Sequence, residues 1–499
     1  MQRSMAFLLA LVLMLSMVQF SVAESNFTMA GLDNSSLNRD WETNLFFQRM
    51  EEKTGVHFSF TQYGEAALWS AAKVEMLAGD TALPDVLFKA DLTPEETVNL
   101  YHAGKLIDLR PYLEKYAPNL WALLKANPAW EKSITLPDGA IVALPALNEL
   151  PNNNIMWINT TWLDALGLSM PTTAEELTEV LRAFKTGDPN KNGSADEVPL
   201  TFMGMWDLKF LAHAFGIVTN DYNLYVDDAE NVVSPLKTDS ERAFLTWLHQ
   251  LWTEGLIDST GFTTIDSFRT ITDSKAAITY GVVLGTTPMN LVPSSALTQY
   301  SLLMPMVYEG KQSYRSLLSD VTRGTFAITS ACADPAALVS WVDYLYSEDG
   351  CRLAQAGMEG VEYEVNADGT WSWLADASTV SQTVLGEATI VEGTAAPGIT
   401  SIAFQTQYDS QDTVQIFKDM QRLKEVSTFP CPLVYLSDDA RTRINEIQSM
   451  LGNYVDVTMT RFVTGDYPLD DAHWNEFCAQ LDALGLDEMI SLWQKAITE

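Results

Sequence analysis

The stretch that decides the fold is Val56-His57-Phe58-Ser59-Phe60-Thr61, in which apolar and polar side chains alternate. A period of two is typical of a β-strand with one buried face. A helical pattern that starts near Trp41 precedes this strand and ends at Gly55, and glycine commonly terminates helices. A second helical pattern, over residues 65–78, follows it. The stretch is therefore a strand between two helices.

The segments outside these two helices continue the alternation of strands with helices. Residues 27–32 and 83–88 are apolar and predict two more strands. Strand, helix, strand, helix and strand at this spacing predict an α/β fold with a mostly parallel sheet and helices on its faces. Farther along, residues 136–145 and 155–159 predict strands, and residues 160–166 and 173–185 predict helices.

The last of these helices leads into Asp188-Pro189-Asn190-Lys191-Asn192-Gly193-Ser194-Ala195-Asp196-Glu197. Ca²⁺ binds six to eight oxygen atoms, and a single loop with oxygen donors on alternate positions can supply them. Gly193 provides the turn that such a loop needs. The candidate ligands are the side chains of Asp188, Asn190, Asn192, Asp196 and Glu197 and the carbonyl of Ser194.

The end of this loop departs from the EF-hand pattern. The closing acidic residue is the tenth of the loop, and the twelfth is Pro199. We therefore expect a calcium loop from which no second helix leaves. The alternative is an ordinary turn, rich in asparagine and glycine, that caps the preceding helix.

Composition limits what the whole chain can be. With 499 residues, of which 47% are hydrophobic, it can bury more than one core. Residues 1–23 have the features of a secretory signal, and no cysteine follows the expected cleavage site to carry a bacterial lipid anchor. A formal net charge of −35 disfavours binding to nucleic acids and anionic membranes.

The four cysteines, Cys332, Cys351, Cys431 and Cys478, form no CxxC pair. A helix expected over residues 334–348 would hold the first two ~20 Å apart, too far for a disulfide. A bond between Cys431 and Cys478 stays open, although we expect four buried thiols.

Several short segments carry a family resemblance. They are Gly79-Asp80 to Pro84-Asp85-Val86, Met156-Trp157-Ile158-Asn159 with residues 162–168, Pro171-Thr172-Thr173 to Leu177, the loop 188–197 with Val198-Pro199-Leu200, residues 346–350, and residues 359–363. In these segments the chain resembles the extracellular solute-binding proteins of ABC importers, in the carbohydrate-type branch with maltose- and alginate-binding proteins.

The resemblance implies a two-lobe periplasmic-binding-protein-like fold of type II, with a hinge and an interlobe cleft. On that template residues 24–152 and 325–365 form the first lobe, and residues 153–324 and 366–499 form the second. The chain would cross near residues 150–158 and 316–328. The calcium loop would be structural and would lie in the second lobe, away from the cleft.

The same resemblance implies a secreted or periplasmic monomer that captures an extracellular oligosaccharide, delivers it to an ABC permease and catalyses nothing. Sugars stack on aromatic rings and exchange hydrogen bonds with polar side chains. Tyr280 is expected at the end of a strand over residues 276–280. The candidate ligand contacts are Trp69, Asp91, Asn154, Trp157, Trp206, Tyr280, Arg315, Tyr363 and Tyr408, each of which could instead be core or surface.

Other functions stay open. A glycoside hydrolase needs two suitably spaced carboxylates, and among 65 aspartates and glutamates no pair stands out. Zinc peptidase, P-loop, nucleophile-elbow and dinucleotide-binding motifs are absent from the sequence. A peptide- or lipid-binding importer component and an adhesion module are further alternatives. The acidic charge disfavours a polyanionic ligand unless Arg315 and nearby lysines form a local basic pocket.

Overall fold

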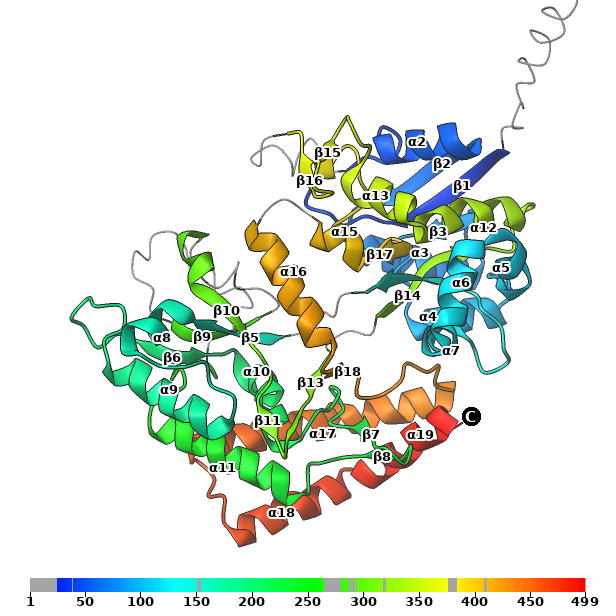
Figure 1. Ribbon diagram of the computed structural model, residues 1–499. Helices are drawn as coiled ribbons and strands as arrows, with labels where there is room; N and C mark the ends of the chain where they lie inside the picture. The colour runs from blue at the N-terminus through cyan, green and yellow to red at the C-terminus, as the bar shows by residue number, and fades with distance from the viewer. Residues whose placement is uncertain are drawn as a thin grey trace, which may run out of the picture.

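The computed structural model describes residues 25–37, 39–149, 154–263, 280–285, 288, 292, 294–316, 320–375, 384–407 and 411–498. They form two lobes, each built around its own sheet (Figure 1). The expected signal segment, residues 1–23, lies outside the described residues.

The first lobe contains a six-stranded sheet in the order β17-β4-β14-β3-β1-β2. β1 pairs in parallel with both β2 and β3, so the three strands predicted from the opening stretch are neighbours. β14 runs antiparallel to β3 and β4. The strand bounds are β1 (Ser25–Leu32), β2 (Val56–Tyr63), β3 (Val86–Phe88), β4 (Leu144–Asn148), β14 (Val321–Ile328) and β17 (Gly398–Thr400).

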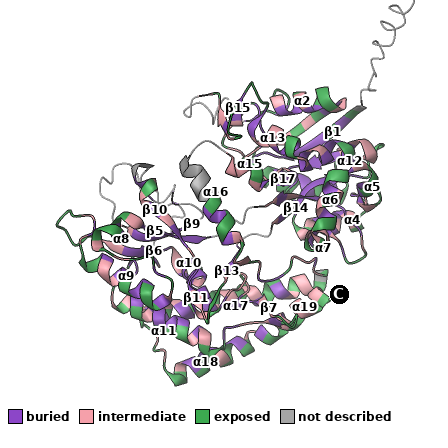
Figure 2. Ribbon diagram, viewed as in Figure 1, coloured by how far each residue is buried: buried purple, intermediate pink, exposed green. Residues whose placement is uncertain are grey.

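Helices cover this sheet, and the residues that face it are buried (Figure 2). The predicted end of the first helix is confirmed: Gly55 has φ 70° and its N–H donates to the carbonyl of Glu51. The helices are α2 (Leu45–Thr54), α3 (Ala66–Ala78), α4 (Pro94–His102), α5 (Arg110–Tyr116), α6 (Pro118–Ala126), α7 (Pro128–Ile134), α12 (Pro335–Asp343) and α13 (Glu348–Ala356).

The second lobe is organised around a four-stranded sheet in the order β10-β5-β9-β6. These strands are β5 (Ile155–Asn159), β6 (Val198–Thr201), β9 (Tyr280–Gly285) and β10 (Tyr300–Leu303). The helices include α8 (Thr160–Leu166), α9 (Ala174–Thr186), α10 (Gly204–Lys209), η1 (Phe210–Phe215), α11 (Asp239–Thr253), α17 (Asp438–Thr464), α18 (Asp471–Ala483) and α19 (Leu486–Thr498). As expected, the helical tail packs on this lobe, with residues from α17, α18 and α19 in its core.

The expected lobe boundary at residue 366 is wrong. The hairpin of β15 (Tyr363–Val365) and β16 (Trp371–Trp373) is followed by β17, which pairs with β4 in the first sheet. Trp371 stacks on Phe404 of α15 (Ile402–Thr406), with ring centroids 4.7 Å apart. The first lobe therefore continues through residue 406, and α16 (Gln411–Lys424) carries the chain back (Figure 1). β17 has only three residues, too few for an apolar pattern in the sequence to predict that the chain returns to the first sheet.

The chain changes sheets near both of the predicted crossings. β4 ends at Asn148 in the first sheet, and β5 begins at Ile155 in the second. β13 (Tyr314–Arg315) precedes β14 and pairs in parallel with β18 (Ser427–Thr428), which follows α16. The hinge region therefore contains three chain segments.

The cysteine prediction is confirmed in part. All four cysteines are free thiols, but only Cys351 and Cys431 are buried, whereas Cys332 and Cys478 are partly exposed. Within the described ranges, no helix combines the length and the apolar character that a membrane span requires.

Candidate ligand-binding cleft

Strand directions show which edges of the two sheets face each other. β1, β2, β3 and β4 all end at the edge from which the chain leaves the first lobe. In the second lobe, the start of β5 lies beside the end of β9, and β9 is parallel to β6. Loops that follow the carboxyl ends of strands in such sheets commonly bind ligands. The candidate site is thus the space between these two sets of loops.

A polar cluster lies at the second-lobe edge. Asn154, just before β5, donates from Nδ2 to Oδ1 of Asp207 in α10 over 2.8 Å. The other oxygen of Asp207 accepts the N–H of Met203 over 2.6 Å. Tyr314 of β13 donates its hydroxyl hydrogen to the Asn154 carbonyl. The first two crossing segments are therefore tied to the loop that follows β6.

Trp206 and Arg315 share one partner in this cluster. The Trp206 indole Nε1 donates to Asp221 Oδ1 over 3.0 Å, and Arg315 Nη2 lies 2.6 Å from the same oxygen. Both side chains contact Phe210, whose ring centroid is 5.0 Å from that of Trp206 and 4.9 Å from the Arg315 guanidinium carbon. Trp206 is 41% exposed. An exposed aromatic ring beside a charged pair is suited to stacking on a sugar.

Three of the predicted ligand contacts, Asn154, Trp206 and Arg315, are thus brought together. Asp221 and Phe210 were not predicted as site residues. Asp221 is 94 positions before Arg315, and no local pattern could have paired them.

His213 is buried behind this cluster and contacts the segments that carry it. Its Nε2 accepts the N–H of Met306 over 2.9 Å, so the hydrogen lies on Nδ1, which is 2.7 Å from the Phe210 carbonyl. The imidazole also packs against Tyr314, with centroids 4.9 Å apart. Complete burial lowers the pKa of His213 to about 4. The neutral imidazole therefore joins the helical wall of the cleft to the segment leading into the second crossing.

Two adjoining cavities lie beside Arg315. One of about 160 Å³ is lined by Asp221, Tyr222, Arg315 and Arg323, among others. The other, of about 430 Å³, shares Ser316 with it and adds Trp130 of α7. Both lobes therefore contribute aromatic and polar side chains to this space.

A cavity of about 820 Å³ lies farther away, between α7, the start of α17 and the end of α19. Two of its arginines are already engaged, Arg110 with Glu131 and Arg443 with Glu488. Arg315 is paired as well, but the space beside it adjoins the loops at the carboxyl ends of the strands, so we favour it as the candidate site.

The first-lobe edge is formed by the turn after β3. Asp91 is exposed there, and its backbone has φ 45°. Trp69, predicted as a ligand contact, is fully buried beneath this turn, and its indole Nε1 donates to the carbonyl of Ala90 over 2.7 Å. In this conformation Trp69 supports the edge of the cleft and has no exposed surface for stacking.

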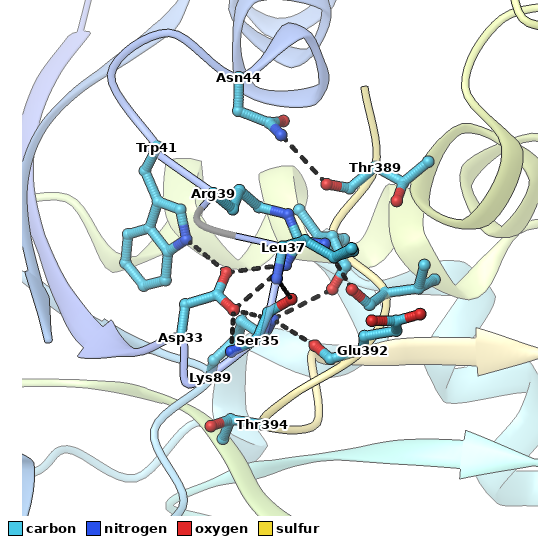
Figure 3. Close-up of polar contacts among 12 residues, drawn as sticks. Asp33, Ser35, Leu37, Arg39, Trp41, Asn44, Lys89, Thr389, Glu392 and Thr394 are labelled. Atoms are coloured by element: carbon cyan, nitrogen blue, oxygen red, sulfur yellow. Dashed lines mark hydrogen bonds and ion pairs between the residues drawn. The ribbon is translucent and has the colours of Figure 1, made fainter. Parts of the chain in front are cut away.

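A buried ionic network lies behind the same turn (Figure 3). Asp33 is 3.0 Å from Lys89 Nζ and 2.9 Å from Arg39 Nη1, and it accepts the indole N–H of Trp41. Burial lowers the pKa of Lys89 to about 8, although the charge of Asp33 opposes the shift. Burial would raise the pKa of Asp33, but Lys89 and Arg39 hold it below its usual value.

This network also joins distant parts of the first lobe. Lys89 donates to the carbonyls of Ile390 and Glu392, and Arg39 donates to that of Leu385 (Figure 3). It therefore fixes the 385–392 segment against the ends of β1 and β3.

The remaining predicted contacts are scattered. Trp157 is buried in β5, and its indole donates to the Gly285 carbonyl at the cleft edge. Tyr363 is buried in β15 against Trp371. Tyr408 lies outside the described residues.

The expected place of Tyr280 at the end of its strand is wrong. Tyr280 begins β9 and pairs with Val198, the first residue of β6. Since β6 and β9 are parallel, Tyr280 lies at the edge of the sheet opposite the cleft.

The loop 188–197 lies outside the cleft, before β6. Asp188 accepts the N–H groups of Asn192 and Gly193, while Asp196 accepts from the amide groups of Asn190 and Asn192. The expectation that no helix follows the loop is confirmed, because β6 begins at Val198.

Glu197 has a buried carboxylate oxygen that a bound cation could satisfy. Its Oε1 is buried without a hydrogen-bond partner. Burial, together with the charges of Asp196 and Asp188, raises the pKa of Glu197. In the part of the chain that is described, no three His, Cys, Asp or Glu side chains are arranged as a metal site. Amide and carbonyl oxygens would therefore have to complete any calcium coordination.

The chain is similar in sequence to a known transport protein. The fructooligosaccharide ABC transporter substrate-binding protein FusA of Streptococcus pneumoniae is 36% identical over 235 residues, which are 45% of this chain and 43% of FusA. The chain thus matches less than half the length of this relative.

Solved structures match over nearly the full length. An HMO-binding solute-binding protein from Bifidobacterium longum infantis has a TM-score of 0.79 at 23% identity, covering 95% of this chain and 99% of that one. A FusA EF-hand mutant in complex with fructo-nystose has a TM-score of 0.70 at 24% identity, with coverages of 94% and 98%. The alginate-binding protein AlgQ2 without calcium ion has a TM-score of 0.67 at 20% identity, with coverages of 96% and 99%. These likenesses show a shared two-lobe fold.

Family membership is decided by the sequence. Residues 34–350, well over half of the chain, match the family described as bacterial extracellular solute-binding protein. The chain therefore belongs to the bacterial extracellular solute-binding proteins.

Proposed function

We propose that this protein captures an oligosaccharide between its lobes and delivers it to the permease of an ABC importer, without chemical change to the ligand. Family membership and the similarity to FusA support this proposal. The observation that carries it is the cluster of Trp206, Arg315 and Asp221 at the cleft edge. Both the indole and the guanidinium can exchange their bonds to exposed Asp221 for bonds to sugar hydroxyls, while the Trp206 ring stacks on the sugar.

A ligand panel tests this function. Kestose and other neutral oligosaccharides should raise the melting temperature, because a ligand that binds only the folded state adds about 2.7 kcal/mol of stability at 100 times its Kd. Peptides serve as the control class, and stabilisation by peptides alone would favour the peptide-binding alternative. Release of reducing ends during incubation would indicate a glycoside hydrolase. Sedimentation should show a monomer.

We further infer that the loop 188–197 holds a structural Ca²⁺. Asp188, Asn190, Asn192, Asp196 and Glu197 would supply side-chain oxygens and Ser194 its carbonyl. The unpartnered Glu197 oxygen supports this assignment, since a divalent cation would compensate its burial beside two other carboxylates. A bound Ca²⁺ would cross-link the end of α9 to the start of β6.

Chelation tests the calcium assignment. Removal of Ca²⁺ should lower the melting temperature of the wild type, and Asp196→Asn should weaken this response. Asp227→Asn is a matched control, because Asp227 also accepts from an asparagine side-chain amide, that of Asn231, in an exposed turn but lies outside the loop. Melting that is unchanged after exhaustive chelation would contradict the assignment.

A further inference from the structure

The smaller cavity beside Arg315 lies where the two lobes meet. β14 of the first lobe contributes Arg323 to its lining, α19 of the second lobe contributes Trp493, and residues 429–434 line it as well. Its volume is about 160 Å³, and it adjoins the cavity of about 430 Å³ through shared lining residues. The smaller cavity therefore has room for one small polar group.

The charge of this cavity is opposite in sign to that of the whole chain. Its charged lining residues are Asp221, Arg315 and Arg323, two arginines against one aspartate, whereas the chain has a formal net charge of −35. Asp221 and Arg315 balance each other, because they form an ion pair at 2.6 Å. Arg323 therefore gives the lining one unbalanced positive charge.

Arg323 is held in place without a carboxylate partner. Its guanidinium carbon lies 4.7 Å from the ring centroid of Tyr435, and its Nη1 donates to the Val434 carbonyl over 3.0 Å. It forms no ion pair with any described residue, and burial lowers its pKa. A guanidinium group has five N–H donors, so further donors remain for a ligand. An anion that accepts from them would balance a charge that is otherwise costly to bury.

Trp493 adds a second unsatisfied donor to the same cavity. Its indole Nε1 is buried, and no atom in the described part of the chain accepts its hydrogen. The ring packs against Tyr222, with centroids 5.3 Å apart. An indole N–H can only donate a hydrogen bond. The group that satisfies Trp493 must therefore be an acceptor, like the group that satisfies Arg323.

We propose that this cavity binds a single oxyanion, which accepts hydrogen bonds from Arg323 and from Nε1 of Trp493. A neutral acceptor such as water leaves the charge of Arg323 unbalanced, whereas a carboxylate, sulfate or phosphate group satisfies both the donors and the charge. Because one donor belongs to each lobe, the bound anion bridges the lobes. The site goes beyond the proposed capture of a sugar and does not depend on it.

Two sources share this chemistry: a free anion, and the carboxylate of an acidic sugar in the adjoining cavity. The first test titrates sulfate and phosphate into the full-length protein at constant ionic strength and measures the melting temperature. Both anions stabilise proteins in general by exclusion from the surface, without saturation. A bound anion adds a saturable rise. The wild type should show this saturable rise, and Arg323→Gln should lose it.

Two further variants sharpen this test. Arg461→Gln is the matched control, because Arg461 also stacks on a tyrosine, at 4.6 Å from the ring centroid of Tyr467, but lies outside the cavity. It should keep the saturable rise. Trp493→Phe keeps the aromatic ring and removes only the N–H, so it should weaken anion binding about tenfold. This variant also decides the question if Arg323→Gln does not fold.

Oligogalacturonate and kestose, titrated calorimetrically, distinguish the two sources. Loss of oligogalacturonate binding in Arg323→Gln, with kestose binding unchanged, would assign the oxyanion to a sugar carboxylate. A saturable response to sulfate or phosphate without oligogalacturonate binding would assign it to a free anion.

The oxyanion site is overturned if Arg323→Gln and the wild type respond equally to sulfate, phosphate and oligogalacturonate, or if Trp493→Phe binds them with wild-type affinity. Failure of the proposed function looks different. A wild type that binds no oligosaccharide contradicts sugar capture, while a saturable sulfate response that depends on Arg323 still supports the oxyanion site.

Discussion

Each lobe contains an aspartate that binds both an arginine and an indole N–H, but the two clusters differ in exposure. In the first lobe, Asp33 binds Arg39 and Trp41, and both charged side chains are 0% exposed. In the second lobe, Asp221 binds Trp206 and Arg315, and its side chain is 62% exposed.

The same chemistry therefore serves two purposes. The buried cluster cannot exchange partners without leaving a charge unsolvated, so it stabilises the first lobe. In the second cluster the exposed Asp221 can be released to water at low cost, whereas Arg315, which is 8% exposed, needs hydrogen-bond acceptors from the ligand in its place. Burial, and not residue type, separates a structural cluster from a candidate binding cluster.

The largest expected effect comes from breaking the buried cluster. Asp33→Asn leaves Lys89 and Arg39 without their counter-charge and should lower the free energy of unfolding by about 3–5 kcal/mol. Asp221→Asn is the matched control in the second lobe and should cost about 1 kcal/mol or less. Urea unfolding of both variants measures the difference. Equal losses would contradict the distinction between the clusters.

A smaller effect is expected from protonation of His213, which packs beneath the exposed cluster of Trp206, Arg315 and Asp221. The folded-state pKa of His213, about 4, is below its ordinary value of 6.5. Between these values the unfolded chain binds more protons, so stability is lost as the pH falls from 6.5 to 4, by up to about 3 kcal/mol. His213→Gln cannot titrate, and its unfolding free energy should depend less on pH over this interval. An identical dependence in the variant would exclude His213 as the source.

The smallest expected effect concerns the exposed ring itself. Trp206→Ala should weaken oligosaccharide binding by about 1–2 kcal/mol, roughly five- to thirtyfold in Kd. Its melting temperature should change little, because Trp206 is 41% exposed. Titration calorimetry measures the affinity, with Trp41→Phe as the buried counterpart that should affect stability first. Unchanged affinity in Trp206→Ala would remove this tryptophan from the site.

Local patterns predicted most of the regular elements. The alternation over residues 56–61, the glycine stop at Gly55 and the absence of a helix after the loop 188–197 are all seen in the structure. The predicted site was less complete. Asn154, Trp206 and Arg315 do meet at the cleft edge, but Trp69 and Trp157 are buried and Tyr280 lies at the opposite edge of its sheet.

The amino-acid sequence by itself determined the α/β class, the helix ends, the oxygen-rich loop and membership of the family, because these depend on short-range periodicity and on residue types at fixed spacing. Only the tertiary structure decided that β16, β17 and α15 belong to the first lobe, which tryptophans are buried, and that Asp221 lies beside Arg315. The physical reason is that burial and pairing depend on segments far apart in the chain, and a residue's neighbours in sequence do not record them.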